Sequence, residues 1–195
     1  MMKIKCTFFL LAAIICCSCH YVQQSGNVLS QSDHETTDVE QQMENEGWTS
    51  VSHENGELGK EFGIENKYGL QDNYFDITIG KGFNVAIKIM DFETNKCIRY
   101  IYVSEASTAT INDIPQGKYY LKLAYGNNWM EQQTDSISIG KFTKDILYER
   151  SKDIYDFGKK NSTSIVNYQL KINVTDNGTM NNFETVPISE REFMK

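Results

Sequence analysis

The chain has 195 residues, a formal net charge of −7 and a hydrophobic fraction of 40%. This length suffices for one folded domain with its own core. An acidic chain without clustered lysine and arginine does not favour nucleic acid as a partner, because nucleic-acid binding depends on such clusters. Of the five cysteines, only Cys97 lies beyond residue 19. A domain with a single cysteine can form no internal disulfide, so its stability must come from a packed core.

The first residues have the pattern of an export signal. Lys3 and Lys5 precede a mostly apolar run over residues 6–18. This run is too short for a membrane span of about twenty residues, but it has the length of the apolar region of a signal peptide. Ser18 followed by Cys19 resembles the lipobox that signal peptidase II cleaves. The resemblance implies a lipoprotein signal peptide over 1–18 and a lipidated Cys19.

Two alternatives remain at this terminus. Cys16 occupies a lipobox position where an aliphatic residue is commoner, so Cys17 is a second candidate for lipidation. The run could also be an ordinary secretory signal that is cut at a small residue. The residue after Cys19 is His20 and not Asp, which resembles outer-membrane sorting in enterobacteria. We therefore expect a lipid-anchored protein of the bacterial cell envelope, at the outer membrane, with several acyl chains holding it firmly.

A polar, acidic stretch follows the predicted lipid anchor. Residues 20–57 contain eight acidic residues and no lysine or arginine. Such a composition cannot bury enough apolar surface to offset its ordering entropy, so 19–57 is expected to be a disordered acidic linker. Trp48 is the exception, either docked on the domain or an anchor for a partner. All three histidines (His20, His34 and His53) fall in this linker.

The rest of the chain, 58–195, is expected to form one all-β domain without histidine. This excludes serine–histidine–aspartate catalysis and histidine-based zinc sites, and we expect no metal and no cofactor. Several segments alternate apolar and polar residues with a period of two, as half-buried strands do, and turn residues separate them. These alternating segments are 75–79, 85–89, 118–125 and 164–174, and a further strand is expected over 97–103, which is rich in β-branched and aromatic residues. Short strands at this spacing predict a small antiparallel β-sandwich.

One segment in this domain carries a family resemblance. Residues 111–119 read Ile-Asn-Asp-Ile-Pro-Gln-Gly-Lys-Tyr, where Pro115 suits the exit of a strand and Gly117 a tight turn. The segment resembles the connection between core strands in carboxypeptidase regulatory-like and transthyretin-like (prealbumin-like) domains, which implies their sandwich fold. Together with Tyr-Gly-Asn-Asn-Trp at 125–129 and the acidic, aromatic residues 189–193, it also resembles uncharacterised lipoproteins of anaerobic gut bacteria. These relatives offer no catalytic residues to transfer.

Trp129 is the centre of the candidate ligand-binding site, with Tyr125, Asn127 and Asn128. An indole beside amides can stack on a sugar ring and hydrogen-bond its hydroxyls. The alternative is that Trp129 covers one end of the core. Other tyrosines are too numerous to be all buried, so an exposed aromatic strip could mark a partner surface.

A cysteine, a serine and a pair of glutamates each allow a structural or a functional interpretation. We expect Cys97 to be a buried structural thiol and not a reactive one. Asp135-Ser136-Ile137 resembles the acceptor of a periplasmic O-glycosylation system, with Ser136 as the modified residue. Glu190 and Glu192 could pair as catalytic carboxylates, but a solvated tail is the simpler interpretation.

These observations predict a non-enzymatic function. The expected protein is a membrane-anchored envelope lipoprotein whose domain binds a protein or glycan partner. The first alternative is a structural or assembly accessory of an envelope complex. The second is a carboxylate-based hydrolase.

Overall fold

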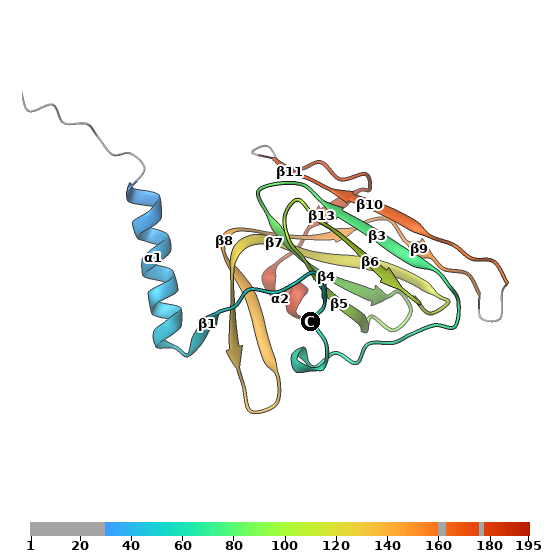
Figure 1. Ribbon diagram of the computed structural model, residues 1–195, viewed down its shortest axis with the longest axis horizontal. Helices are drawn as coiled ribbons and strands as arrows, with labels where there is room; N and C mark the ends of the chain where they lie inside the picture. The colour runs from blue at the N-terminus through green and yellow to red at the C-terminus, as the bar shows by residue number, and fades with distance from the viewer. Residues whose placement is uncertain (1–29, 160–162, 176–177) are drawn as a thin grey trace, which may run out of the picture.

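Two β-sheets packed face to face form the body of the protein in the computed structural model (Figure 1). The structure describes residues 30–159, 163–175 and 178–195. The predicted signal peptide, Cys19 and the first part of the linker lie outside these residues. The predicted all-β class and sandwich architecture are confirmed.

The larger sheet is antiparallel throughout and has the strand order β13-β8-β7-β4-β5-β2, with β1 and β9 also paired to β7. Its members are β1 (Trp48–Ser50), β2 (Gly56–Glu57), β4 (Asn84–Asp91), β5 (Cys97–Val103), β7 (Lys118–Gln133), β8 (Ser138–Ser151), β9 (Tyr155–Asp156) and β13 (Thr185–Pro187). The long β7–β8 hairpin extends beyond the region where the two sheets face each other (Figure 1).

The smaller sheet has the order β10-β3-β6, from β3 (Tyr74–Ile79), β6 (Thr108–Asn112) and β10 (Tyr168–Ile172). Its β3–β6 pair is antiparallel, but β10 pairs with β3 in parallel, which the alternation pattern alone could not predict. Two short strands, β11 (Val174–Thr175) and β12 (Gly178–Thr179), pair antiparallel with each other.

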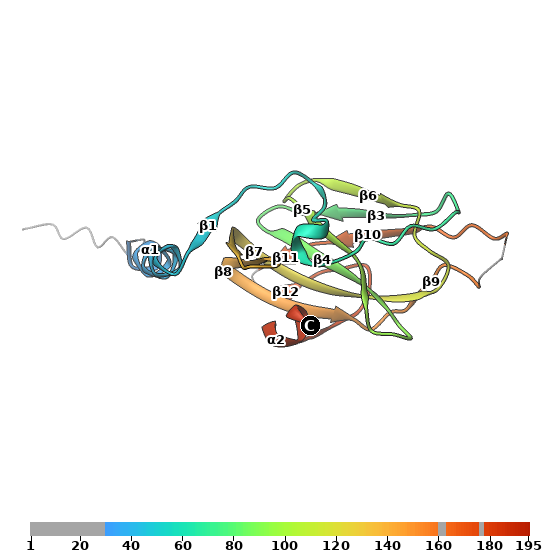
Figure 2. The same ribbon diagram turned by 90° about the horizontal axis from the view of Figure 1, so that it is seen from below.

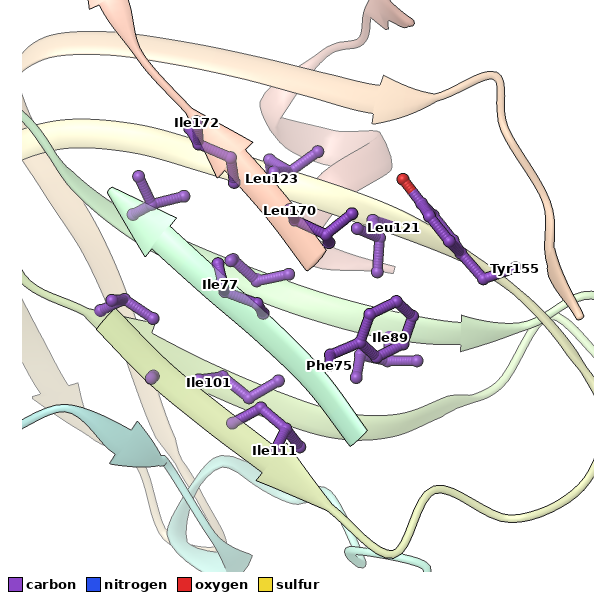
Figure 3. Close-up of a cluster of buried hydrophobic side chains, with 14 of the residues drawn as sticks. Phe75, Ile77, Ile89, Ile101, Ile111, Leu121, Leu123, Tyr155, Leu170 and Ile172 are labelled. Carbon is purple, nitrogen blue, oxygen red and sulfur yellow. The ribbon is translucent and has the colours of Figure 1, made fainter. Parts of the chain in front are cut away.

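The core between the sheets confirms the predicted alternation. Phe75, Ile77 and Ile79 on β3 point toward Ile87 and Ile89 on β4, and all five are buried. Figure 3 shows how side chains from both sheets interleave there. Burial of this many large aliphatic and aromatic side chains, at about 1.5–3 kcal/mol each, provides the main driving force for the fold.

The opposite face of the larger sheet carries a second apolar cluster, which the sequence pattern did not indicate. Helix α2 (Glu190–Met194) lies beneath this face (Figure 2) and buries Phe193 to 1% exposure. The C-terminal end is therefore a packed helix and not a free tail, although Glu190 on it is exposed to solvent, as expected. The chain forms a helix here because the Ser189 side chain caps its start by accepting a hydrogen bond from the Glu192 amide. The helix then places Phe193 against the sheet.

The segment 111–119 connects the end of β6 to the start of β7, with Pro115 and Gly117 between the two strands. Asp113 adopts a positive φ of 57°, and the hydroxyl of Tyr119 donates a hydrogen bond of 3.0 Å to the carbonyl of Pro115. Gly69 passes so close that a Cβ there would lie 2.8 Å from the carbonyl oxygen of Ile114. Only glycine fits at that approach.

The part of the predicted linker that the structure describes, from residue 30 onward, contains regular secondary structure. It contains helix α1 (Ser30–Asn45) and strands β1 and β2, so the chain joins the larger sheet at Trp48, before the expected domain start at Leu58. The Lys141 ammonium lies 5.0 Å from the centroid of the Trp48 ring, so Trp48 docks on the domain, as one of its two interpretations proposed. Helix α1 contacts the β7–β8 hairpin through Glu40, which accepts hydrogen bonds from Asn128 and Thr143. Within the described residues, no helix has the length and apolar character needed to cross a membrane.

Candidate functional site

Trp129, the centre of the predicted ligand site, lies in the second apolar cluster with 3% exposure. Its ring meets Phe142 edge to face at a centroid distance of 4.9 Å, and its indole nitrogen donates a 2.8 Å hydrogen bond to Glu131 Oε1. Gly140 on β8 provides the space for the indole ring, because a Cβ at this position would lie only 2.2 Å from Cζ2 of Trp129. Trp129 is therefore packed inside the second cluster, on the face of the larger sheet that points away from the core between the sheets, and its ring face is not available to a sugar.

The structure does not bring the other three predicted residues together with Trp129. Tyr125 is buried on the opposite face of the sheet, where its hydroxyl donates to Glu149 Oε2 at 2.9 Å. Asn127 donates to the carbonyl of Gly82 at 3.0 Å. Asn128 has a positive φ of 53° and donates to Glu40 at 2.5 Å. All four positions serve the fold or the docking of α1.

His53 belongs to the folded domain, so the expectation of a domain without histidine is wrong. Its Nε2 contacts Glu131 Oε1. Its ring lies 5.5–6.3 Å from those of Tyr102, Trp129 and Phe62. The strand-forming residues 48–51, Trp-Thr-Ser-Val, could have indicated that this segment joins the sheet. Glu131 and the aromatic rings give His53 a packing role.

A groove opens on the second face, between the segment after the short helix η1 (Lys60–Phe62) and helix α2. It has two adjoining hollows that share Phe62, Ile64, Lys88 and Met194. The first, of about 200 Å³, is mostly apolar. The second, of about 510 Å³, is mostly polar and is lined by three further lysines and one glutamate, namely Lys67, Lys96, Lys195 and Glu65.

Lys88 forms the floor where the two hollows meet. It is 8% exposed, and its Nζ donates to the carbonyl of Phe193 at 3.0 Å. The same ammonium lies 5.2 Å from the Tyr100 ring centroid and 4.9 Å from that of Phe193. Burial, followed by the neighbouring Lys122, lowers the pKa of Lys88 below its ordinary value. A desolvated cation with a neutral carbonyl partner is a strong attractor for an anion.

Lys122 is the register partner of Lys88 on β7 and is also nearly buried. Its Nζ donates to the carbonyl of Glu192 at 2.6 Å. Both lysines therefore bind carbonyls at the C-terminal half of α2, where positive charge is favourable. The pair attaches the helix to the sheet and fixes one wall of the groove.

Cys97 borders the polar hollow, and its position agrees with a structural role. It is half-buried, and its Sγ donates to the carbonyl of Arg99 at 3.0 Å. Burial raises the pKa of the thiol to about 11, and a thiol that stays protonated is a poor nucleophile.

Two of the described carboxylates, those of Glu149 and Asp91, hold structural positions. Glu149 is buried and accepts from Tyr125 and Thr179. Asp91 accepts from the Glu93 and Thr94 amides and the Thr94 hydroxyl in one turn; these bonds outweigh the effect of desolvation and lower its pKa. Among the described residues, no three histidine, cysteine or acidic side chains are arranged to hold a metal ion.

Ser136 lies exposed at the tip of the β7–β8 hairpin. The tip is closed by hydrogen bonds between Thr134 and Ile137. An exposed hairpin tip is accessible to a modifying enzyme, so the structure leaves the glycosylation prediction in place without testing it.

Comparison with known proteins returned no match: no family model, no curated protein and no solved structure is similar to this chain at a significant level.

Proposed function

We propose that this chain is a lipid-anchored protein of the bacterial envelope, placed at the outer membrane by Cys19, and that its β-sandwich is a non-catalytic binding module for a protein or glycan partner. The apolar run over 6–18 and the Ser18–Cys19 junction support the anchor. The groove beside α2 is the observation that supports binding.

The groove has the mixed character of a recognition site. Binding pockets combine apolar walls with a few polar groups that fix orientation, and here apolar side chains and lysines meet at Lys88. A non-catalytic role is favoured because His53 and Glu131 are paired within an aromatic cluster and the carboxylates of Glu149 and Asp91 are engaged in structural hydrogen bonds.

The finer family assignment is part of the same proposal. The connection over 111–119 supports a transthyretin-like sandwich, since Pro115 and Gly117 lie between the end of β6 at Asn112 and the start of β7 at Lys118, and the Tyr119 hydroxyl donates back to the carbonyl of Pro115. The parallel pairing of β10 with β3 departs from the purely antiparallel sandwich that we expected from the sequence.

The anchor is tested by growing cells with a clickable fatty-acid probe. We expect label on the wild-type chain and on Cys17→Ala, and none on Cys19→Ala. Label retained by Cys19→Ala would move the anchor to Cys17, and an unlabelled wild type would overturn the anchor.

The binding role is tested with the full chain in detergent, on a glycan array and in pull-downs from envelope extracts. The variant Lys67→Glu/Lys96→Glu reverses charge in the groove, and Lys171→Glu on β10 is the matched control. We expect a partner that the double variant loses and the control retains. A partner insensitive to the double variant would place binding elsewhere, and the absence of any partner would overturn the binding role.

A further inference from the structure

We infer that the groove beside α2 binds a carboxylate that carries one ring-sized apolar group. This inference rests on the proposed binding function and specifies its ligand chemistry.

The apolar hollow sets the size of the apolar group. Its volume is about 200 Å³, and an apolar protein cavity of about 150 Å³ is large enough to hold benzene. The hollow is lined by Phe62, Ile64, Tyr100, Ile137 and Met194, so contact with a phenyl ring or a branched alkyl group is favourable.

The lysines set the charge of the ligand. Lys67 and Lys96 line the polar hollow, and Lys88 borders both hollows. Within the described residues, none of these three ammonium groups lies within 4.0 Å of a carboxylate. Glu65 is the one acidic side chain of the polar lining, so the lysines outnumber it.

Lys88 gives the site its geometry. Its ammonium is nearly buried, donates to one backbone carbonyl and otherwise lies near the Tyr100 and Phe193 rings. A carboxylate at the junction would compensate the desolvation of Lys88 directly. Its apolar group would then enter the adjoining hollow. Charge-assisted hydrogen bonds of this kind are about twice as strong as neutral ones.

The same chemistry occurs in a free aromatic carboxylate and in the last residue of a peptide with a C-terminal phenylalanine. The test therefore uses isothermal titration of the full chain in detergent with two probes, 3-phenylpropionate and acetyl-glycyl-phenylalanine. Controls that each lack one element are 3-phenylpropanol, acetate and acetyl-glycyl-phenylalanine amide.

We expect at least one acid probe to bind at least about tenfold more tightly than its uncharged analogue and than acetate. Preference for the dipeptide acid indicates a peptide source, and preference for phenylpropionate a free carboxylate. Binding of the uncharged analogues at equal strength, or no binding of either acid, would overturn the inference.

Two variants locate the bound acid. We expect Lys67→Glu/Lys96→Glu to weaken binding by about tenfold or more, whereas Lys171→Glu leaves it unchanged. Lys88→Met should abolish binding, and circular dichroism checks that it folds; if it does not, the surface double variant decides alone. If the double variant and the wild type bound the acid equally well, the acid would not lie in the groove and the proposed site would be wrong.

The outcomes distinguish this inference from the proposed function. If an envelope partner is captured but neither acid binds, the ligand chemistry fails and the binding role stands. If an acid binds in the groove but no envelope partner is found, the groove is a small-molecule site and the partner proposal fails.

Discussion

The carboxylate of Glu131 accepts a 2.8 Å hydrogen bond from the indole nitrogen of Trp129, two residues earlier on the same strand. Successive side chains of a strand point to opposite faces, so residues two apart share one face. This shared face is the apolar second face of the larger sheet, where the carboxylate also contacts His53. Trp129, which was expected at a binding surface, is therefore buried in the second apolar cluster, and the Glu131 carboxylate connects it to His53 of the N-terminal segment.

We expect Glu131→Ala to lower the free energy of unfolding by about 1–3 kcal/mol, because two donors, on Trp129 and His53, lose their acceptor. Urea unfolding followed by tryptophan fluorescence measures the change. Glu93→Ala, at an exposed turn position, should leave the free energy of unfolding within about 0.5 kcal/mol of wild type. Equal effects of the two substitutions would contradict the role given to Glu131.

Gly140→Ala should destabilise the domain by about 1–3 kcal/mol or more through overpacking, since its Cβ would lie 2.2 Å from Cζ2 and 2.7 Å from Cε2 of Trp129. Trp129→Phe removes both atoms. In a double-mutant cycle, the alanine should therefore cost much less on the Trp129→Phe background. Additive costs would show that the indole is not the obstacle. Ser136→Ala at the hairpin tip serves as the control.

The buried Arg99 guanidinium pairs with Glu57 at 2.7 Å and lies 3.8 Å from the Tyr68 ring centroid. We expect Glu57→Ala to cost about 3 kcal/mol of unfolding free energy, because it leaves a buried cation without its anion. Glu184→Ala breaks the exposed pair with Lys152 and should cost about 0–1 kcal/mol. Thermal or urea unfolding of both variants makes the comparison; a Glu57→Ala loss as small as that of Glu184→Ala would contradict it.

Alkaline pH should unfold the domain. Burial raises the pKa of Tyr119 to about 12 and raises those of Tyr100, Tyr125 and Tyr155. The unfolded chain loses these protons near pH 10, so the stabilisation is complete below pH 10 and is lost as pH rises toward 12. Urea midpoints and phenolate absorbance follow the loss together. Tyr119→Phe should make the decline shallower. If the phenolate absorbance of the folded protein reached the full value of the unfolded chain near pH 10, so that the buried tyrosines also lost their protons there, this account would be contradicted.

Local alternation predicted the part of the fold that depends on one buried face. Phe75 and Ile77 on β3, and Ile87 on β4, share the inter-sheet core as their spacing indicated. Lys88 lies between Ile87 and Ile89 on β4 and points to the other face of the sheet, where α2 covers it. The covering helix is five residues long and distant in sequence, so no local pattern reveals that it packs there.

The candidate site was less predictable because it depends on segments far apart in the chain. Lys88, Phe62 and Met194 meet in the groove only after β4, η1 and α2 are assembled. The local sequence did single out Trp129 as an important side chain. Whether a tryptophan binds a ligand or packs inside the fold depends on its exposure to solvent, and that exposure is set by the tertiary structure. The acidic composition before Trp48 likewise concealed the strand pairing of 48–50 with β7.

The central claim is that an acylated Cys19 begins the mature chain and holds the sandwich at the envelope. Intact-mass spectrometry of the protein purified from membranes tests it most directly. The account predicts a chain from Cys19 to Lys195 with the added mass of at least two acyl groups. A mass that corresponds to an unmodified chain beginning at Met1, or at any residue without acyl groups, would contradict it.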